Sequence, residues 1–458
     1  MAAGSAHRVA LTGWGRTNPS VAEVRHLDAD VLRTAVLGCG ARGALVRGLG
    51  RSYGDAAQNA GGLVALLPDV GVQGGVGVHG GVDEGEITVG AGTSIDALLR
   101  MIIPMGWFVP VTPGTRFVTV GGAIASDVHG KNHHVDGSFG SHVSRMTLLR
   151  ADGSTELLDP SMPLFWATVG GMGLTGAILD ATIRLVPIET SRMSVHTSRI
   201  EDLDALMAAM SEDDEKFRYS VAWIDLMARG RSLGRSVLTR GDHARVAQLD
   251  ARDAGDPLEF DPRQVASVPP IIPPPGVLNR LSVAAFNEFW FRRAPRHRCD
   301  ELQSVSEFFH PLDLVGSWNR LYGARGMVQY QFVVPFGEED TVRTVVERLS
   351  DSRITSFLAV LKRLGEANPA PLSFPRAGWT LALDVPASSP GLSGLLHSLD
   401  DIVLDAGGRH YFAKDSCTTR AAIERGYPRL AEWRQIRTSA DPERRWQSDL
   451  GRRLGLLD

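Results

Sequence analysis

The sequence has few cysteines and lacks any long apolar run. Its three cysteines, Cys39, Cys299 and Cys417, lie far apart and form no CxxC pair. This odd, sparse set excludes a disulfide framework and a thiolate site for zinc or an iron–sulfur cluster. Because no uninterrupted apolar run reaches about 18 residues, we expect no membrane-spanning helix. The opening residues also lack the apolar run of a secretory signal, so we expect no signal peptide.

Basic clusters are missing as well. Lys and Arg together number 48 against 52 Asp and Glu, which gives a formal net charge of −4. Since binding to a phosphate backbone needs a clustered basic footprint, the sequence predicts that nucleic acid is not a partner. The length of 458 residues, 43% of them hydrophobic, fits a globular protein of two or three domains.

Glycine, in contrast, is abundant and concentrated in the first 180 residues. The densest stretch runs from Pro113 to Gly140 and reads PGTRFVTVGGAIASDVHGKNHHVDGSFG. Glycine at this density allows backbone N–H groups to approach a ligand closely and to point in one direction. Such a surface suits a phosphate group, and the imidazole and ammonium groups within it suit redox or proton chemistry. We therefore predict that a large phosphorylated ligand binds here.

A second glycine-rich segment, Arg47–Asp55 (RGLGRSYGD), follows a short strand predicted over Ala44–Val46. The pattern is typical of a phosphate-binding loop, although a plain hairpin turn explains it equally well when the loop is taken alone. The loop does not open a Rossmann βαβ unit, because the AAQNAGG that follows is a poor helix start. Nearby, we expect one helix over Val21–Val36 and another that begins at Thr93 or Ser94 and runs through Ile103.

The character of the sequence changes near residue 190 and again near residue 408. Between them glycine is less frequent, and predicted strands such as Met327–Pro335 alternate with helices. Gln329 and Gln331 share one face of that strand. The proline-rich segment Val268–Pro275 and the apolar stretch that continues to Phe291 either pack onto the protein or form an exposed, lipid-facing flap.

Three motifs carry a family resemblance: RGLGRSYGD, the PGT…TVGGAIASDVHG segment that ends at Gly130, and FWATVGGMGLTGAI (Phe165–Ile178). They resemble the vanillyl-alcohol-oxidase type of FAD-binding domain, and the tail Tyr427–Trp446 resembles the aldonolactone-oxidase branch. The segments HGKNHH, FHPLDLVGSWNRLYG, QYQF, PLSFP and AKDS are similar to those of actinobacterial decaprenylphosphoryl-β-D-ribose 2′-oxidases. The likeness extends over nearly the whole chain.

The resemblance implies an α+β fold with two domains. A PCMH-type FAD-binding domain would comprise residues 1–190 and 411–458, and a substrate domain with an antiparallel sheet would comprise residues 191–410. The implied reaction is oxidation of the ribose 2′-hydroxyl of decaprenylphosphoryl-β-D-ribose to a ketone, with hydride transfer to the flavin. This would be the first half of the epimerisation that supplies arabinose for cell-wall arabinan, and an NADH-dependent short-chain reductase would complete it.

The resemblance also implies where FAD binds. The first glycine loop and a turn at 119–122 would hold the pyrophosphate, and residues 126–129 would lie beside the isoalloxazine. Many relatives attach FAD through a histidine in the first loop; Arg51 stands at that position and cannot form the bond, so we predict non-covalent FAD. The predicted cofactor residues are Val46, Arg47, Gly48, Leu49, Gly50, Arg51, Ser52, Tyr53, Gly54, Asp55, Ala56, Gly114, Thr119, Val120, Gly121, Gly122, Ser126, Asp127, Val128, His129, Ile178 and Tyr411.

Lys414 is the first candidate for the base that removes the hydroxyl proton, provided that burial or a nearby cation lowers its pKa. Asp415 would oppose this shift unless its side chain points away. His129 and Tyr53 are the next catalytic candidates. His133 and His134 are as easily structural, and because no acidic ligand accompanies them we predict no metal. The predicted substrate contacts are Lys131, for the lipid phosphate, and Asn319, Gln329, Gln331 and Lys362.

Two other functions stay open on the sequence alone. One is an alditol or aldonolactone oxidase with a small soluble sugar and oxygen as acceptor. The other is a flavin-binding redox partner without a substrate of its own. Arg51 and the apolar stretch 268–291 favour a lipid-linked substrate, a polyprenyl-phosphate sugar. Such a substrate implies peripheral membrane association, on either the periplasmic or the cytoplasmic face.

Overall fold

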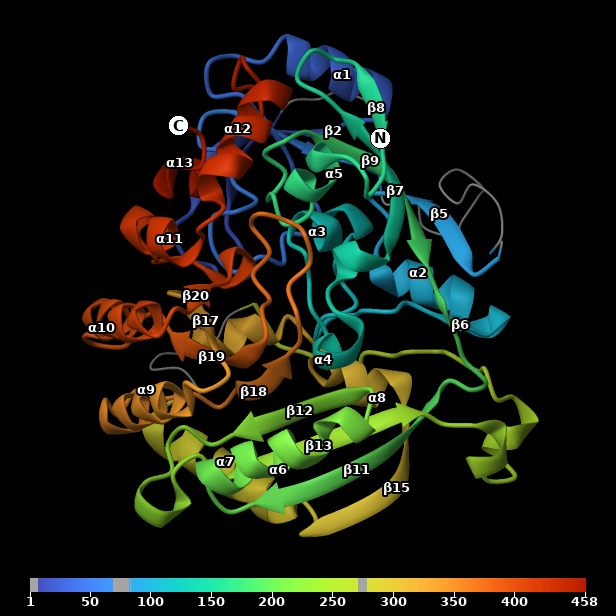
Figure 1. Cartoon of the computed structure of the whole chain (residues 1–458), viewed down its shortest axis with the longest axis vertical. Helices are drawn as coiled ribbons and strands as arrows, with labels where there is room; N and C mark the ends of the chain where they lie inside the picture. The colour runs from blue at the N-terminus through green and yellow to red at the C-terminus, as the bar shows by residue number, and fades with distance from the viewer. Residues whose placement is uncertain (1–6, 69–81, 83, 271–277) are drawn as a thin grey trace.

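The computed structural model describes residues 7–68, 82, 84–270 and 278–458. It combines helices with mostly antiparallel sheets, which confirms the predicted α+β class. In Figure 1 the N-terminal elements and the C-terminal helices share the upper part of the molecule, and the middle of the chain builds the lower part. Among the described residues, no helix has the length and apolar character needed to cross a bilayer.

The first sheet contains four strands in the order β1 (His7–Leu11), β2 (Ser20–His26), β4 (Leu63–Leu66) and β3 (Ala44–Val46). The helix expected over 21–36 was wrong in its first half. Residues 20–26 pair antiparallel with β1 and parallel with β4, so backbone pairing on both edges outweighs the helical spacing of the apolar side chains. The helix α1 (Ala29–Leu37) begins only after Asp28, whose carboxylate caps it.

The second sheet has the strand order β5 (Glu86–Gly90), β9 (Ala177–Arg184), β7 (Val143–Leu149) and β8 (Thr155–Leu158). As expected, α2 (Ile95–Ile102) is capped by Ser94 and buries its apolar face in the core. The short helices α3 (Val120–Ala125), α4 (His133–Asp136) and α5 (Pro163–Thr168) lie in the glycine-rich region. β6 (Trp107–Phe108) pairs with β10 (Val186–Pro187).

The end of the chain returns to this part of the molecule. The helices α11 (Arg420–Gly426), α12 (Leu430–Ala440) and α13 (Asp449–Arg453) pack beside the first 190 residues (Figure 1). The fully buried indole of Trp433 on α12 donates a hydrogen bond from Nε1 to the carbonyl of Ala167 on α5, at 2.8 Å. Both ends of the chain therefore share one core.

A sheet of eight strands drawn from residues 192–410 dominates the rest. All its neighbouring pairs are antiparallel. Its strand order is β15 (His297–Ser304), β11 (Arg192–Ile200), β13 (Ser236–His243), β12 (Tyr219–Ile224), β18 (Ala359–Leu364), β19 (Gly378–Pro386), β17 (Met327–Pro335) and β20 (Arg409–His410). The division into domains at residues 190 and 410 stays a prediction, and it agrees with this grouping of strands.

The two faces of the large sheet have different partners. One face packs against α6 (Leu203–Asp213), α9 (Glu339–Asp351) and α10 (Leu392–Asp405) in a single apolar core. On β17, Val328, Tyr330 and Phe332 belong to that core. Because side chains alternate along a strand, Gln329 and Gln331 face the opposite side, where they line a cavity.

Two further helices, α7 (Arg280–Arg293) and α8 (Val305–Phe309), contribute side chains to that cavity. A short parallel pair joins β14 (Ala266–Ser267) and β16 (Val315–Gly316). The expected flap over 268–291 lies partly outside the described residues, since 271–277 are not described. Of its described part, Val268 is buried and residues 280–291 belong to α7.

Candidate active site

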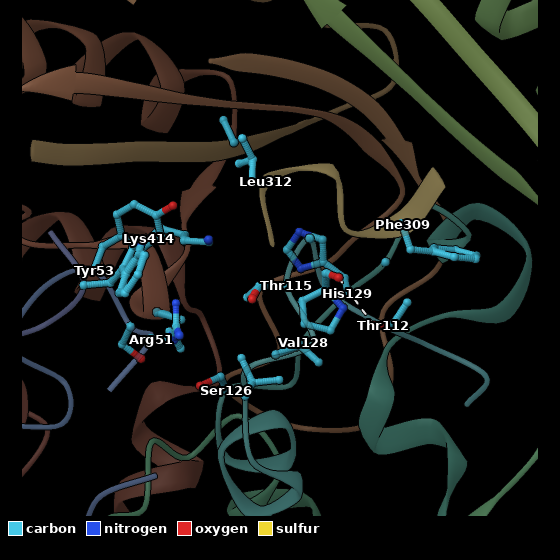
Figure 2. Close-up of a pocket in the computed structure, with 18 of the residues that line it drawn as sticks. Arg51, Tyr53, Thr112, Thr115, Ser126, Val128, His129, Phe309, Leu312 and Lys414 are labelled. Atoms are coloured by element: carbon cyan, nitrogen blue, oxygen red, sulfur yellow. Dashed lines mark hydrogen bonds between the residues drawn. The ribbon is translucent and has the colours of Figure 1, made fainter. Parts of the chain in front are cut away.

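A large cavity of about 1110 Å³ lies between the glycine-rich loops and the uncovered face of the eight-stranded sheet. It is larger than the roughly 300–1,000 Å³ of ordinary small-ligand pockets, so it offers room for a dinucleotide and a second ligand. Figure 2 shows Arg51, Tyr53 and Lys414 on one side of it and His129 and Thr112 on the other, with Ser126 below. Segments far apart in the sequence thus meet around one space.

The cofactor half of the cavity is lined by glycine-rich backbone, and several of its glycines leave no room for a larger side chain. A Cβ on Gly48 would lie 2.4 Å from the hydroxyl of Thr119, and one on Gly121 would lie 2.9 Å from the Cβ of Ala91. Gly50 has a φ of +64°, which favours glycine. Gly114, with open space around it, also lines the cavity. This cradle of close-packed backbone fits the pyrophosphate and ribityl parts of FAD.

Most of the predicted cofactor residues line the cavity. The turn at residues 119–122 is the first turn of α3, which Thr119 caps. The phenol of Tyr411 donates to the carbonyl of Ser126 at 2.7 Å, so the C-terminal segment closes this side. The predicted cofactor residues on the wall are Val46, Arg47, Gly48, Leu49, Gly50, Arg51, Ser52, Tyr53, Ala56, Gly114, Thr119, Gly121, Gly122, Ser126, Val128, His129, Ile178 and Tyr411.

Four predicted cofactor residues do not line it. Val120 is fully buried in the core. Gly54 packs against the carbonyl of Asp415, where a Cβ would be only 2.0 Å away. Asp55 forms an ion pair with Arg453. The buried carboxylate of Asp127 accepts hydrogen bonds from three partners around it, the amides of Gly140 and Asn368 and the hydroxyl of Ser373. These four residues shape the loops behind the wall.

Lys414 ends a short 3-10 turn after β20 and enters the cavity. Its Nζ lies 4.3 Å from the centre of the Tyr53 ring, and the backbone N–H of Tyr53 donates to the carbonyl of Ala413 at 2.8 Å. Burial lowers the pKa of Lys414, and the charge of Asp384 offsets part of that shift. A buried lysine with a lowered pKa can accept a proton near neutral pH.

The neighbouring Asp415 does not oppose this shift. Its carboxylate accepts a hydrogen bond from Arg453 at 2.8 Å and two more from the backbone N–H groups of Cys417 and Thr418. Burial alone would raise the pKa of Asp415, but Arg453 and these N–H groups outweigh it and lower the pKa. Arg453 also binds Asp55, so one guanidinium joins the first glycine loop to the segment that carries Lys414.

Asp384 on β19 is a site residue that the sequence reasoning missed. It is fully buried and accepts a short hydrogen bond from the amide of Gln329. Burial raises its pKa, and the positive charge of Lys414 and the bond from Gln329 reduce that effect. The signal was present in WTLALDV, because an acidic residue in an otherwise apolar, buried strand usually has a charged or polar partner.

The eight-stranded sheet holds His129 in one tautomer. The amide of Gln331 lies 3.0 Å from its Nε2 and also donates to the hydroxyl of Thr380, whose own proton goes to the carbonyl of Phe332. Nε2 of His129 therefore accepts, and Nδ1 carries the proton. Burial and three nearby cationic or imidazole groups lower the pKa of His129 well below its usual value. Nδ1 is buried without a partner among the described residues, which leaves a donor for a ligand.

Two further lysines face the same space. The Nζ of Lys131 donates to the carbonyl of Phe308 and lies 4.2 Å from the centre of that ring. The Nζ of Lys362 lies 3.4 Å from the carbonyl of Gly130. Burial lowers the pKa of Lys131 to about 7, with a smaller effect from Lys362. Burial, and then the charge of Lys414, lowers the pKa of Lys362 to about 7.

The distribution of lysine itself singles out this site. The sequence contains four lysines among its 48 basic residues, and three of them line the cavity: Lys131, Lys362 and Lys414. The fourth, Lys216, is largely exposed and pairs with Asp213. Arginine carries the positive charge almost everywhere else in the chain. Because lysine changes its pKa readily when buried and arginine does not, this usage points to sites where a proton moves.

The remaining predicted residues, Asn319, His133 and His134, form hydrogen bonds with backbone groups of the protein. Asn319 does not line the cavity, because its amide donates to the carbonyl of Trp14 at 2.8 Å; Trp14 itself lines the wall. His133 accepts from the backbone of Gly365, and His134 bonds to backbone carbonyls of residues 214 and 217. In the described ranges, no three His, Cys, Asp or Glu side chains gather as metal ligands. The absence of a metal stays a prediction.

Comparison with known proteins agrees with this architecture. Residues 27–159 match the family described as FAD binding domain, and residues 386–454 match D-arabinono-1,4-lactone oxidase. The decaprenylphosphoryl-β-D-ribose oxidase of Mycolicibacterium smegmatis is 45% identical over 98% of this chain and 97% of its own length. The chain belongs to this oxidase family. It is an FAD-dependent oxidoreductase that acts on a CH–OH group.

Two more relatives match different shares of this chain. An uncharacterized Streptomyces coelicolor protein from the mprA 5′ region is 40% identical over 79% of this chain and all of its own length. The Delta(24)-sterol reductase of Macaca fascicularis is 29% identical over 27% of this chain and 23% of its own. The similarity to the oxidase covers both the loops that fit FAD and the sheet that faces them.

FAD, when bound, supplies the hydride acceptor for oxidation of an alcohol. The protein residues supply the rest. Lys414 can take up the hydroxyl proton, His129 can donate a hydrogen bond from Nδ1, and Lys131 and Lys362 add positive charge. These groups lie between the glycine loops and the eight-stranded sheet, where partial burial strengthens electrostatic interactions relative to bulk water.

Proposed function

We propose that the protein oxidises the 2′-hydroxyl of decaprenylphosphoryl-β-D-ribose to the 2′-ketone. The observation that carries the proposal is the set of three half-buried lysines with lowered pKa values around one cavity, beside loops that fit FAD. The name of the 45% identical relative supports the substrate class. A phosphorylated ribose linked to a lipid needs both a base for its hydroxyl and cations for its phosphate.

In this proposal each lysine has its own role. The neutral amine of Lys414 removes the 2′-hydroxyl proton and becomes an ammonium ion, which Asp384 stabilises. Lys131 and Lys362 bind the phosphodiester, since their charged forms gain from a nearby anion what burial costs them. His129 and Gln331 orient the ribose, and Gln329 fixes the carboxylate of Asp384.

Arg51 supports non-covalent binding of FAD. Its guanidinium lies 3.9 Å above the ring of Trp14, at the position where relatives with covalent flavin carry the linking histidine. Arginine has no nucleophilic nitrogen at neutral pH and cannot form that link. Acid precipitation tests this directly: a colourless pellet with free FAD in the supernatant is expected, and a pellet that stays yellow excludes it.

The finer biological setting belongs to the same proposal. The 2′-ketone is an intermediate, and an NADH-dependent short-chain reductase would reduce it to the arabino epimer. The polyprenyl chain requires that the enzyme associate peripherally with a membrane, on the periplasmic or cytoplasmic face. Sedimentation with vesicles that contain polyprenyl phosphate tests the membrane contact; protein that stays in the supernatant would exclude it.

One experiment tests the central reaction. Farnesylphosphoryl-β-D-ribose is added without oxygen to the protein saturated with FAD, and the visible absorbance of the oxidised flavin is followed. The proposal expects stoichiometric bleaching. Bleaching by alditols or aldonolactones but not by the lipid-linked ribose would identify a small-sugar oxidase. No bleaching by any of these compounds would identify a flavoprotein without such a substrate.

A further inference from the structure

Part of the cavity lies beyond the lysines and has no role in the chemistry above. It extends over the uncovered face of the large sheet toward β13 and α7. Across five adjacent strands, cross-strand partners form one continuous row: Gln331 on β17, Ala382 on β19, Val360 on β18, Trp223 on β12 and Val237 on β13. Four interstrand spacings make this row roughly 19 Å long. All five residues line the same cavity.

The row changes character along its length. It begins at Gln331, which binds His129, and beyond Ala382 it consists only of apolar side chains. The indole N–H of Trp223 is already satisfied by the carbonyl of Phe357 at 3.0 Å, so the ring offers only its apolar surface. Lys362 lies two residues from Val360 on the same strand and therefore on the same face. The ammonium group of Lys362 therefore lies near Val360, the first residue of this apolar part of the row, which we call the apolar track.

The helix α7 forms a second apolar wall of this part of the cavity. Phe286 and Trp290 are one helical turn apart, and their rings stack with centroids 6.0 Å apart. Both line the cavity, and each remains 40% exposed. The ring of Phe286 also packs edge-on against Phe357 at 5.7 Å. Two large stacked aromatic side chains that are only half buried indicate a surface that a ligand covers.

Residues next to the aromatic pair on α7 fix the helix in place. The amide of buried Asn287 donates to Asp225 at 2.7 Å, and Arg235 bridges Asp225 and Glu288 at 2.8 and 2.7 Å. Phe291 is buried. Polar contacts of neighbouring residues on the helix therefore help to fix the position of the aromatic pair. At the far end, the cavity wall becomes charged, with Arg293, Arg298 and Glu301.

We propose that the track from Val360 to Val237, together with Phe286 and Trp290, binds the first isoprene units of the lipid-linked substrate. The inference rests on the proposed function for the identity of the lipid, and it follows from the continuity of the track with the lysines. The phosphate lies at Lys362 and Lys131, and the chain leaves it along the apolar row. The charged rim at Arg293 and Arg298 marks where the rest of the chain leaves the protein.

The test compares chain lengths in two variants of the same helix. The double variant Phe286→Ala/Trp290→Ala removes the aromatic wall, and Phe289→Ala, 59% exposed on the same helix and off the cavity wall, is the matched control. Anaerobic flavin bleaching is measured with farnesylphosphoryl ribose and with ethylphosphoryl ribose. We expect the double variant to lower kcat/KM for the farnesyl substrate about tenfold, roughly 1.4 kcal/mol, and to leave that for the ethyl substrate unchanged. The control changes neither.

A second readout does not need turnover. Calorimetric binding of farnesyl phosphate to the FAD-loaded protein should weaken about tenfold in the double variant and stay unchanged in the control. The assignment would be overturned if wild type, the double variant and the control bound farnesyl phosphate equally well. It would also be overturned if the double variant lost the same factor in kcat/KM with the farnesyl and the ethyl substrate. Phe286 and Trp290 would then contact something other than the lipid, such as a protein partner. Binding of farnesyl phosphate without any bleaching by ribosyl substrates would leave the lipid track standing and refute the proposed function instead.

Discussion

The amine of Lys414 lies directly over the ring of Tyr53, with 4.3 Å between Nζ and the ring centroid. These residues come from the two ends of the chain, and the bond from Tyr53 N–H to Ala413 holds their segments together. Burial of both side chains disfavours their charged forms, so the pKa of Lys414 falls and the pKa of Tyr53 rises. This packing thus makes the neutral amine that a general base requires easier to reach.

Replacing Lys414 with Met should slow flavin reduction by about 10²–10⁴-fold, the usual contribution of a positioned base. Lys414→Arg should not restore the rate, because a guanidinium keeps its proton. Lys216→Met, at the one lysine away from the cavity, is the matched control and should react at the wild-type rate. Anaerobic stopped-flow measurement of bleaching gives the rates. A Lys414→Met enzyme that still reacts within threefold of wild type would remove Lys414 from the role of base.

The pH dependence of bleaching should identify the same group. If neutral Lys414 is the reactive form, the rate rises with pH and levels off well below the ordinary lysine pKa. Asp384 favours the charged form of Lys414, so Asp384→Asn should move the inflection to lower pH. Asp400→Asn, a carboxylate bonded to Tyr330 in the core behind the sheet, is the control and should leave the inflection in place. A profile unaffected by Asp384→Asn would show that the two charges do not interact.

Arg453 should be critical for stability although it does not line the cavity. Arg453→Met leaves the carboxylate of Asp415 buried without its cation, which typically costs about 3–5 kcal/mol in the free energy of unfolding. Adding Asp55→Asn and Asp415→Asn should recover most of the loss. Arg425→Met, whose pair with Asp405 is exposed, should cost about 0.5 kcal/mol or less. Urea unfolding measures the free energy of unfolding of all three variants. A loss below about 1 kcal/mol in Arg453→Met would show that the ion pairs of Arg453 with Asp55 and Asp415 are dispensable.

Lys362 should make the protein more stable at alkaline pH. Its folded pKa, about 7, lies below that of an unfolded lysine. Between pH 7 and 9 the unfolded chain therefore binds more protons than the folded one, and stability rises with pH. From pH 7 to 9 the free energy of unfolding of wild type should rise by about 2 kcal/mol more than that of Lys362→Met. Urea titrations at both pH values measure the difference. No gain relative to Lys362→Met would mean that Lys362 keeps its charge in the fold.

Much of this site could be predicted because its signals are local. Glycines that leave no room for a Cβ, such as Gly48 and Gly121, mark the loops, and strand alternation placed Gln329 and Gln331 on the cavity face. What the sequence could not provide depends on contacts between distant segments. Asp384 gains its role only because β19 passes near Lys414, and Asn319 turned to Trp14 instead of the cavity.

The same limit explains the error in secondary structure. Val21 and Val24 have helical spacing, but residues 20–26 gain backbone partners on both sides from β1 and β4. No pattern within the segment reveals those partners. The apolar track was also hidden, since Trp223, Val237 and Val360 are ordinary strand residues until the sheet order aligns them.

Isotopic substitution tests the central claim most directly. Farnesylphosphoryl ribose deuterated at C2 or at C3 is mixed without oxygen with the FAD-loaded enzyme, and bleaching is timed. Oxidation of the 2′-hydroxyl breaks the C2–H bond, so bleaching should slow severalfold with the C2-deuterated compound only, and the product should lack that deuterium. Slower bleaching with deuterium at C3, or retention of deuterium at C2 in the oxidised product, would contradict the account.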